Sequence, residues 1–317
     1  MHWLAKAALH KAVSVLPRAE SANYLLQRHV TKTLPASERS FRRKFGRALI
    51  HVDAYARHGP PRALGDAVFY EFGVGWDLTI PLAYWALGVD RQVLVDLRPH
   101  LRAELVAATL TRFQELGPEL EEEAGRPLRD PGTDVRLDRL AEHFGIEYLA
   151  PRDARRTGLE AGSVDFVTST STLEHVPAQD VLPLLAECRR VLAAHGAMSS
   201  VIDLRDHFSY FDRGLSPYNF LRYSDRTWRL VDSGLAHQNR LRSSNYQPLF
   251  EAAGLTVVSK RGKLPRRKKL EPPQGSDLAP RFRGYRPEDL AVIRLDVVAR
   301  PADGLPDAVQ EVGDLGG

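Results

Sequence analysis

The stretch EFGVGWD, Glu71 to Asp77, places a glycine-rich turn between two carboxylates. It follows the apolar run AVFY at residues 67–70, which is typical of a buried strand, and it precedes a helical pattern at residues 79–87. A glycine turn between a first strand and a first helix is where doubly wound sheets hold nucleotide-like ligands. The stretch therefore predicts an α/β fold with a ligand site at the carboxyl end of its first strand.

Short apolar runs alternate with longer helical patterns along the rest of the chain. Helices between successive strands imply parallel strand pairing, with helices on both faces of the sheet. We therefore expect a Rossmann-like, doubly wound, mostly parallel seven-stranded sheet. The further strands are expected at residues 92–96, 146–150, 164–170, 198–203, 255–260 and 291–299, and the further helices at 99–116, 178–194 and 246–253. Residues 117–133 are acidic and rich in Gly and Pro, which predicts a surface excursion.

The remaining segments flank or interrupt this sheet. Residues 1–66 are polar-rich with helical spacing and predict an N-terminal helical extension. A core domain is expected over residues 67–300, with an insertion at 204–245 after the fifth strand and a basic loop at 261–290. Residues 301–317 are polar and predict a flexible C-terminal tail.

The composition is that of an ordinary globular protein, with 43% hydrophobic and 26% charged residues among 317. The single cysteine, Cys188, cannot form an intramolecular disulfide, so a reducing compartment and a cytoplasmic location are expected. No run approaches the ~20 apolar residues of a membrane span. The 44 basic residues exceed the 40 acidic ones only slightly, which argues against a nucleic-acid partner.

Two segments suggest further contacts. Residues 2–16 have apolar side chains at helical spacing between Lys6, His10 and Lys11, which predicts an amphipathic helix docked on the protein. A helix that binds a membrane surface or a partner protein is the alternative. Residues 261–269, RGKLPRRKK, favour a solvated loop over a patch for an acidic substrate, nucleic acid or an anionic membrane. The oligomeric state is left open.

The charges around the glycine turn narrow the choice of ligand. A dinucleotide fingerprint, G-x-G-x-x-G, would need glycine at position 78, where the chain has Leu78. Glu71 and Asp77 would repel a pyrophosphate but suit an ammonium or sulfonium group. Asp96 ends the second predicted strand beside the turn, where a carboxylate can accept hydrogen bonds from both ribose hydroxyls. S-adenosylmethionine has the ribose, the positive charge and the lack of phosphates that these residues favour.

From about residue 67 to residue 258 the sequence resembles the class I S-adenosylmethionine-dependent methyltransferases. Their first motif is an acid followed by Gly-x-Gly-x-Gly, and Asp77 stands here in place of the third glycine. SVDFVTSTSTLEHV is similar to their fourth-strand motif, and RRVLAAHGAMSSVID is similar to their passage into the fifth strand. The resemblance implies a cofactor site made by Glu71, Gly73, Gly75, Asp96 toward the ribose, Asp153 toward the adenine, and Thr170.

The methyl acceptor is expected beyond the fourth and fifth strands. Methyl transfer is an in-line displacement, so the protein mainly aligns the two reactants, and a His or carboxylate takes any proton that the acceptor loses. His175 and His207 are the candidates for this role. Residues 208–228 hold 7 of the 26 aromatic residues, interleaved with arginines. They predict a lid over the acceptor pocket, with a structural cap or a dimer contact as the alternative.

These observations favour a methyltransferase that acts at oxygen or nitrogen of a small molecule or glycan precursor. A nicotinamide oxidoreductase on the same sheet, and a non-catalytic binding protein of the same fold, are the alternatives. No Cys/His cluster has the spacing of metal ligands, so no metal is expected.

Overall fold

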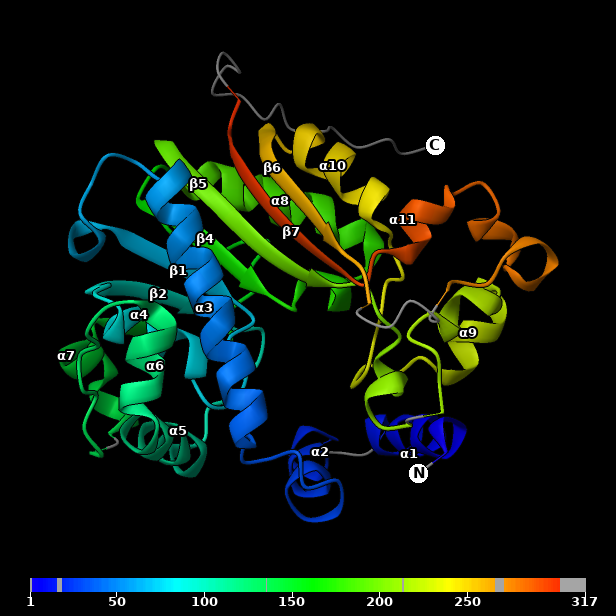
Figure 1. Ribbon diagram of the computed structural model, residues 1–317, viewed down its shortest axis with the longest axis horizontal. Coiled ribbons are helices and arrows are strands. Elements are labelled where there is room, and N and C mark those ends of the chain that lie inside the picture. The colour runs from blue at the N-terminus through cyan, green and yellow to red at the C-terminus, as the bar shows by residue number, and fades with distance from the viewer. Residues whose placement is uncertain (1, 16–18, 135, 213, 266–270, 303–317) are drawn as a thin grey trace.

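The computed structural model describes residues 2–15, 19–134, 136–212, 214–265 and 271–302. Within these ranges the strands form one seven-stranded sheet in the order β3-β2-β1-β4-β5-β7-β6 (Figure 1). The pairs among β1 to β5 are parallel, and β7 runs antiparallel to β5 and β6. The predicted mostly parallel α/β sheet is confirmed. The strands are β1 (Val68–Phe72), β2 (Arg91–Val95), β3 (Ile146–Leu149), β4 (Val164–Thr170), β5 (Leu192–Asp203), β6 (Leu255–Lys263) and β7 (Arg294–Pro301).

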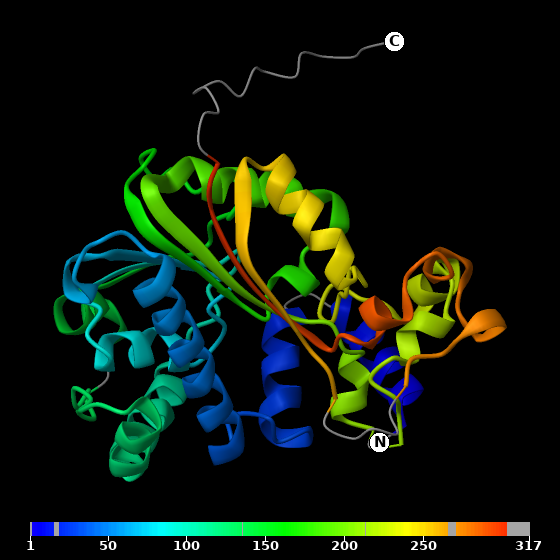
Figure 2. The same cartoon turned by 45° about the horizontal axis from the view of Figure 1, so that its top comes forward.

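Helices cover both faces of the sheet, as Figures 1 and 2 show. Side chains alternate between faces along a strand, so Phe69 of β1 joins one hydrophobic core and Tyr70 joins the other. The first core is closed by α3 (Glu38–His58), α4 (Thr79–Ala86), α5 (Ala103–Glu115), α6 (Gly117–Ala124) and α7 (Leu140–Phe144), and the second by α8 (Ala178–Val191) and α10 (Ser243–Ala252).

The predicted surface excursion at residues 117–133 is wrong for its first half, which is helix α6. Pro118 lies in the first turn, where its missing N–H costs nothing, and Gly125 ends the helix in the left-handed conformation. Leu120 is fully buried and holds α6 on the first core. Proline and glycine therefore mark the ends of this helix, whereas the sequence analysis took them as evidence against one.

Other boundaries differ in smaller ways. Helix α8 stops at Val191, before the predicted residue 194, because the chain at Leu192 already pairs with Val164 of β4. A register shift follows there, and β5 therefore begins six positions before the predicted 198. Helix α5 begins at Ala103 rather than 99. Strand β7 begins at Arg294 rather than 291, because α11 (Pro287–Ala291) precedes it.

The N-terminal helices pack on the rest of the chain. Helix α3 places Phe41, Phe45 and Ala48 in the first core, so it is part of the sheet's own packing. Helix α1 (Trp3–Ser14) buries Trp3 against the rings of Phe208 and Tyr223. The helix is therefore docked on the insertion after β5, which agrees with the predicted amphipathic helix docked on the protein. The short helix α2 (Ala19–Leu25) lies between them. Among the described residues, no helix has both the length and the apolar character needed to cross a membrane.

The insertion after β5 forms a small core of its own. It contains short 3-10 turns at His207–Tyr210 and Asn219–Arg222 and the helix α9 (Asp225–Val231). Four of its aromatic residues are buried in this core together with residues of α1 and of 278–290, and none of the four lines the pocket described below; they are Phe208, Tyr218, Phe220 and Trp228. The predicted lid stays a prediction. Tyr210 is different, because it lines the pocket described below.

The predicted basic loop and tail are described only in part. Residues 261–263 belong to strand β6, so the loop begins later than expected. Residues 266–270 of this loop, and residues 303–317 of the predicted tail, lie outside the described ranges.

Arg242 links the insertion to the sheet. Its side chain is completely buried, and its guanidinium donates hydrogen bonds to the carbonyls of Leu204 at 2.8 Å, Leu290 at 3.0 Å and Val292. Leu204 directly follows β5, and the other two carbonyls lie in and after α11, so one side chain joins both ends of the region that contains the aromatic core.

Arg242→Met is expected to lower the free energy of unfolding by about 3 kcal/mol, because three buried carbonyls lose a charged donor. Urea unfolding followed by circular dichroism measures this change. Arg226→Met on the exposed side of α9 is the matched control and should shift stability by less than ~0.5 kcal/mol. Equal unfolding midpoints for the two variants would contradict the role given to Arg242.

Candidate functional site

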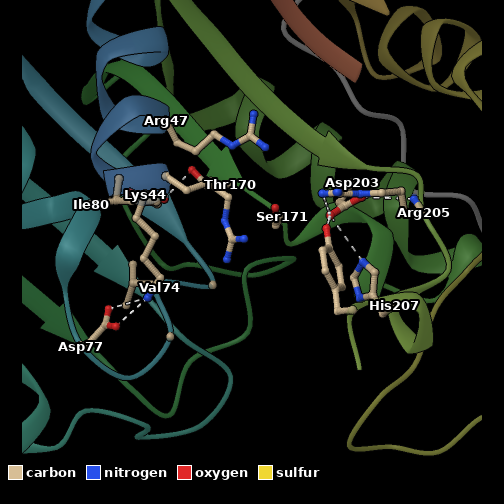
Figure 3. A pocket seen from close by; sticks show the side chains of 15 residues that line it. Lys44, Arg47, Val74, Asp77, Ile80, Thr170, Ser171, Asp203, Arg205 and His207 are labelled. Carbon is tan, nitrogen blue, oxygen red and sulfur yellow. Dashed lines mark hydrogen bonds and ion pairs between the residues drawn. The ribbon is translucent and has the colours of Figure 1, made fainter. Parts of the chain in front are cut away.

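A pocket of about 300 Å³ lies at the carboxyl ends of β1, β4 and β5 (Figure 3). Its wall comes from the end of β1 with the glycine turn and the start of α4, from the N-terminal half of α3, from the end of β4, and from the end of β5 with the residues that follow it. In the strand order, β1 and β4 are adjacent although β2 follows β1 in sequence. Open α/β sheets bind ligands at such a switch point.

The two glycines of the turn have distinct reasons to be glycine. Gly73 has a φ of +74°, and a Cβ there would lie 2.4 Å from Cγ2 of Thr172, so no side chain fits. Gly75 has a φ of +78° with open space around it, which leaves its backbone accessible to a ligand. Leu78 also has a positive φ, 51°, and caps α4, so the chain takes this conformation without the glycine of a dinucleotide fingerprint.

Glu71 is held from behind by a chain of hydrogen bonds. The Thr170 hydroxyl donates its only proton to Glu71 Oε1 at 3.2 Å. The same hydroxyl oxygen therefore accepts a hydrogen bond from the N–H at His51 Nε2, at 3.0 Å. His51 Nδ1 in turn accepts from the Ser199 hydroxyl at 2.8 Å. The other oxygen of Glu71, Oε2, is buried without a partner. Burial raises the pKa of Glu71 to about 8.

Asp77 does not face a ligand as expected. Its carboxylate, 2% exposed, binds Lys44 Nζ of α3 at 2.6 and 2.8 Å and accepts from the backbone N–H and hydroxyl of Thr79 at the start of α4 (Figure 3). Lys44 therefore neutralises this charge. Both acids line the pocket as expected, but Asp77 is paired with Lys44, so only Glu71 is left to meet a cationic ligand.

Asp96 and Asp153 differ in how they relate to the turn. Asp96 follows β2 and accepts a hydrogen bond from the Gly75 N–H at 3.3 Å, and burial raises its pKa to about 7. Asp153 forms an ion pair with Arg155 at 2.7 Å, and Arg155 also binds Asp180. Neither aspartate lines the pocket. The structure thus joins Asp96 to the turn and leaves Asp153 in an ion pair at the surface.

His175 and His207 lie together, with ring centroids 4.8 Å apart. His207 lines the pocket, whereas His175 does not and is exposed. Asp203, at the end of β5, binds Arg205 at 2.9 Å and lies 3.9 Å from His207 Nε2 (Figure 3). The two histidines are therefore neighbours although 32 positions separate them in the sequence.

Arginines dominate the outer part of the site. A second cavity, of about 860 Å³, shares Arg43, Arg47, Arg205 and Tyr210 with the first. Arg39, Arg43 and Arg47 are four residues apart and therefore lie on one face of α3, and Nη1 of Arg47 is buried without a partner. Glu123 is the one acidic residue among those that line this cavity in the described structure.

Several of these residues escaped the sequence analysis. Lys44, Arg47 and His51 come from α3, which was expected to belong to a separate extension. The spacing of four between Arg39, Arg43 and Arg47 was the available signal. His51 carried no such signal, because its partners Thr170 and Ser199 lie more than one hundred residues away in the chain.

Residues 133–199 match the family model of the methyltransferase domain. This segment holds β3, β4, α8 and the first part of β5, so it includes strands beside the pocket. This match and the strand order of the sheet support the resemblance to the class I S-adenosylmethionine-dependent methyltransferases. The match to a methyltransferase domain favours S-adenosylmethionine over a nicotinamide as the cofactor.

Other comparisons add less. The fold is similar to that of 1,6-didemethyltoxoflavin-N1-methyltransferase from Burkholderia thailandensis, with 14% identity over 91% of this chain and 92% of that one and a TM-score of 0.46. It is also similar to a methyltransferase of Methanosarcina mazei, with 14% identity over 76% and 94% and a TM-score of 0.42. Similarity this low indicates nothing about a shared substrate. No curated protein matches the chain.

The buried carboxyl of Glu71 should make the ligand-free methyltransferase sensitive to pH. Its folded-state pKa of about 8 lies above its ordinary value of 4.5. Its stabilising contribution is therefore complete below pH 4.5 and is lost as the pH rises toward 8. Glu71→Gln should reduce the fall in melting temperature between pH 5 and pH 8, measured by calorimetry without cofactor.

The exposed Asp53→Asn variant on α3 is the control and should keep the wild-type pH dependence. If the melting temperature of Glu71→Gln falls between pH 5 and pH 8 as much as that of the wild type, the Glu71 carboxyl is ionised in the folded protein over this whole pH range.

Proposed function

We propose that this methyltransferase transfers a methyl group to an oxygen or nitrogen of a small-molecule or glycan-precursor acceptor that carries an anionic group. The observation that supports this acceptor is the arginine-lined cavity that shares Arg43, Arg47 and Arg205 with the pocket at the glycine turn. Its volume, about 860 Å³, lies in the range of small-molecule sites.

The residues at the strand ends fit S-adenosylmethionine. Glu71 lines the pocket and its Oε2 has no partner, so the cofactor's ammonium would offset the cost of ionising this buried carboxyl. Thr170 orients Glu71, while Gly73 and Gly75 allow the cofactor to lie against the backbone. The bound cofactor supplies a methyl group already activated by its sulfonium.

The nucleoside end of the cofactor is assigned to the two remaining acids. Asp96 would accept hydrogen bonds from the ribose hydroxyls, because its carboxyl lies directly behind the turn and contacts the Gly75 N–H. Asp153 would accept from the adenine amino group. This second contact requires the Asp153 carboxylate to retain a free lone pair beside Arg155, which a bidentate ion pair leaves available.

The acceptor end is assigned to the residues after β4 and β5. Arg43, Arg47 and Arg205 would hold the anionic group, which fixes the acceptor before the methyl carbon. His207 lines the same pocket, with His175 in contact behind it. We therefore assign these two histidines to the proton that the reacting atom of the acceptor loses. The other residues of the pocket align the acceptor with the methyl group and exclude water during the in-line displacement.

Asp96→Ala should weaken binding of S-adenosylhomocysteine by ~1–3 kcal/mol, because the ribose hydroxyls lose their acceptor. Isothermal titration calorimetry at pH 8, above the Asp96 pKa of about 7, measures this loss when the carboxylate is ionised. Asp138→Ala, in an exposed acid remote in sequence from the turn, should bind like the wild type. An unchanged dissociation constant for Asp96→Ala would refute the ribose role.

Replacing the cavity arginines should separate acceptor binding from cofactor binding. Label transfer from S-adenosylmethionine to a library of phosphorylated, carboxylated and neutral acceptors should give turnover in the anionic sets. The double variant Arg43→Met/Arg47→Met should lower kcat/KM for such an acceptor at least ~100-fold, about 3 kcal/mol. Its affinity for S-adenosylhomocysteine should stay within about twofold, or ~0.4 kcal/mol.

Arg112→Met on the exposed side of α5 is the control. Turnover confined to neutral acceptors would overturn the anionic acceptor but keep the methyltransferase. Cofactor binding without turnover of any acceptor would favour the non-catalytic alternative.

A further inference from the structure

Three metal-binding side chains meet behind the acceptor pocket. Glu174 and His175 belong to the short turn after β4 (Leu173–His175), and His207 begins the turn after β5. Because β4 and β5 are parallel neighbours, both turns leave the sheet at the same edge. One potential ligand atom from each side chain lies within 4.8 Å of the other two.

The carboxyl group of Glu174 is buried but has no hydrogen-bond or ion-pair partner among the described residues. The residue is 3% exposed, and neither carboxyl oxygen forms a hydrogen bond. The backbone N–H groups of Glu174 and Asp203 lie near it without forming one. Buried carboxylates are normally paired or bound to a metal, because an unpaired buried charge costs several kcal/mol. No side chain in the described part of the protein donates a hydrogen bond to Glu174, so the carboxyl group is left without a direct partner.

The turn that holds Glu174 is fixed by its surroundings. The side-chain amide of Asn239 donates to the carbonyls of Leu173 at 2.8 Å and Val176 at 2.9 Å, one on each side of the Glu174–His175 pair. The Asn239 backbone N–H donates to the carbonyl of Glu174 at 2.9 Å. Three hydrogen bonds from one residue thus preset the positions of two candidate ligands.

The two histidines are also presented in a metal-binding form. His175 Nδ1 donates to the backbone carbonyl of His237 at 2.6 Å, which leaves the lone pair of Nε2 available. A carbonyl in this position is the usual outer partner of a metal-bound imidazole. His207 Nε2 is buried without a hydrogen-bond partner, and the His207 backbone N–H is anchored on Gln238 at 3.0 Å.

We propose that Glu174, His175 and His207 bind one divalent transition-metal ion, of which Zn²⁺ and Mn²⁺ are the representatives to test. Two imidazoles and one carboxylate suit such ions, and three protein ligands leave coordination positions open. His207 lines the acceptor pocket, so an open position would be within reach of an acceptor oxygen. His207 would then be a ligand in the metal-loaded protein, and its direct role toward the acceptor would apply to the metal-free form.

The sequence alone did not predict this cluster, and no metal was therefore expected. Glu174 and His175 are adjacent, and His207 lies in another turn, so the three have no familiar ligand spacing. Only the pairing of β4 with β5 brings them together.

Metal titration of the full chain tests the proposal independently of methyl transfer. Untagged protein is stripped with a chelator, freed of it, and titrated with Zn²⁺ and separately with Mn²⁺ by calorimetry. We expect one equivalent of at least one ion to bind. His175→Ala, His207→Ala and Glu174→Gln should each weaken that binding at least tenfold, while His195→Ala, which removes an exposed histidine of β5, should not.

Circular dichroism and S-adenosylhomocysteine binding establish that each variant is folded. If the buried Glu174→Gln variant fails to fold, His175→Ala, whose side chain is exposed, decides the result. The proposal is overturned if the wild type binds neither ion stoichiometrically, or if folded His175→Ala binds as tightly as the wild type. A protein that binds the ion but methylates nothing would contradict the proposed function and leave the metal site intact.

Discussion

The site depends on one costly arrangement, a carboxyl group buried at the end of β1 with only one oxygen satisfied. Thr170 fixes that oxygen of Glu71, and His51 and Ser199 fix Thr170, so the carboxyl group is held in the pocket wall with its other oxygen unpaired. Because the network spans β1, β4, β5 and α3, the orientation of Glu71 reports the correct packing of α3 on the sheet. A ligand ammonium would satisfy the remaining oxygen, which gives the fold a reason to prefer a cationic cofactor at this point.

Helix α3 has a larger part in the site than its place before the first strand suggests. One of its faces enters the hydrophobic core through Phe41 and Phe45, and another carries Arg39, Arg43 and Arg47 into the outer cavity. Lys44 meanwhile neutralises Asp77. The same helix thus cancels a negative charge beside the glycine turn and concentrates positive charge where the acceptor is proposed to bind.

The sequence was sufficient for the sheet and for the turn. The apolar runs at β1, β2 and β4 identify buried strands on their own, and the two glycines mark a turn in which Gly73 passes close to Thr172 and Gly75 leaves its backbone accessible. The sequence could not predict partners that are distant in the chain. No residue near Asp77 in the sequence indicates its ion pair with Lys44. The aromatic residues after β5 suggest a lid in the sequence, whereas the structure packs Trp3 against them. The Glu174, His175 and His207 group shows the same limit, because strand pairing alone makes it a cluster.

The packing of Trp3 into the aromatic core has a consequence for biosynthesis. Trp3 of helix α1 is made more than two hundred residues before Phe208, whose ring packs against it. The indole of Trp3 therefore lacks this partner until the insertion after β5 has been synthesised, and contacts so distant in sequence form slowly. The docking of α1 is accordingly a late event in the formation of this structure.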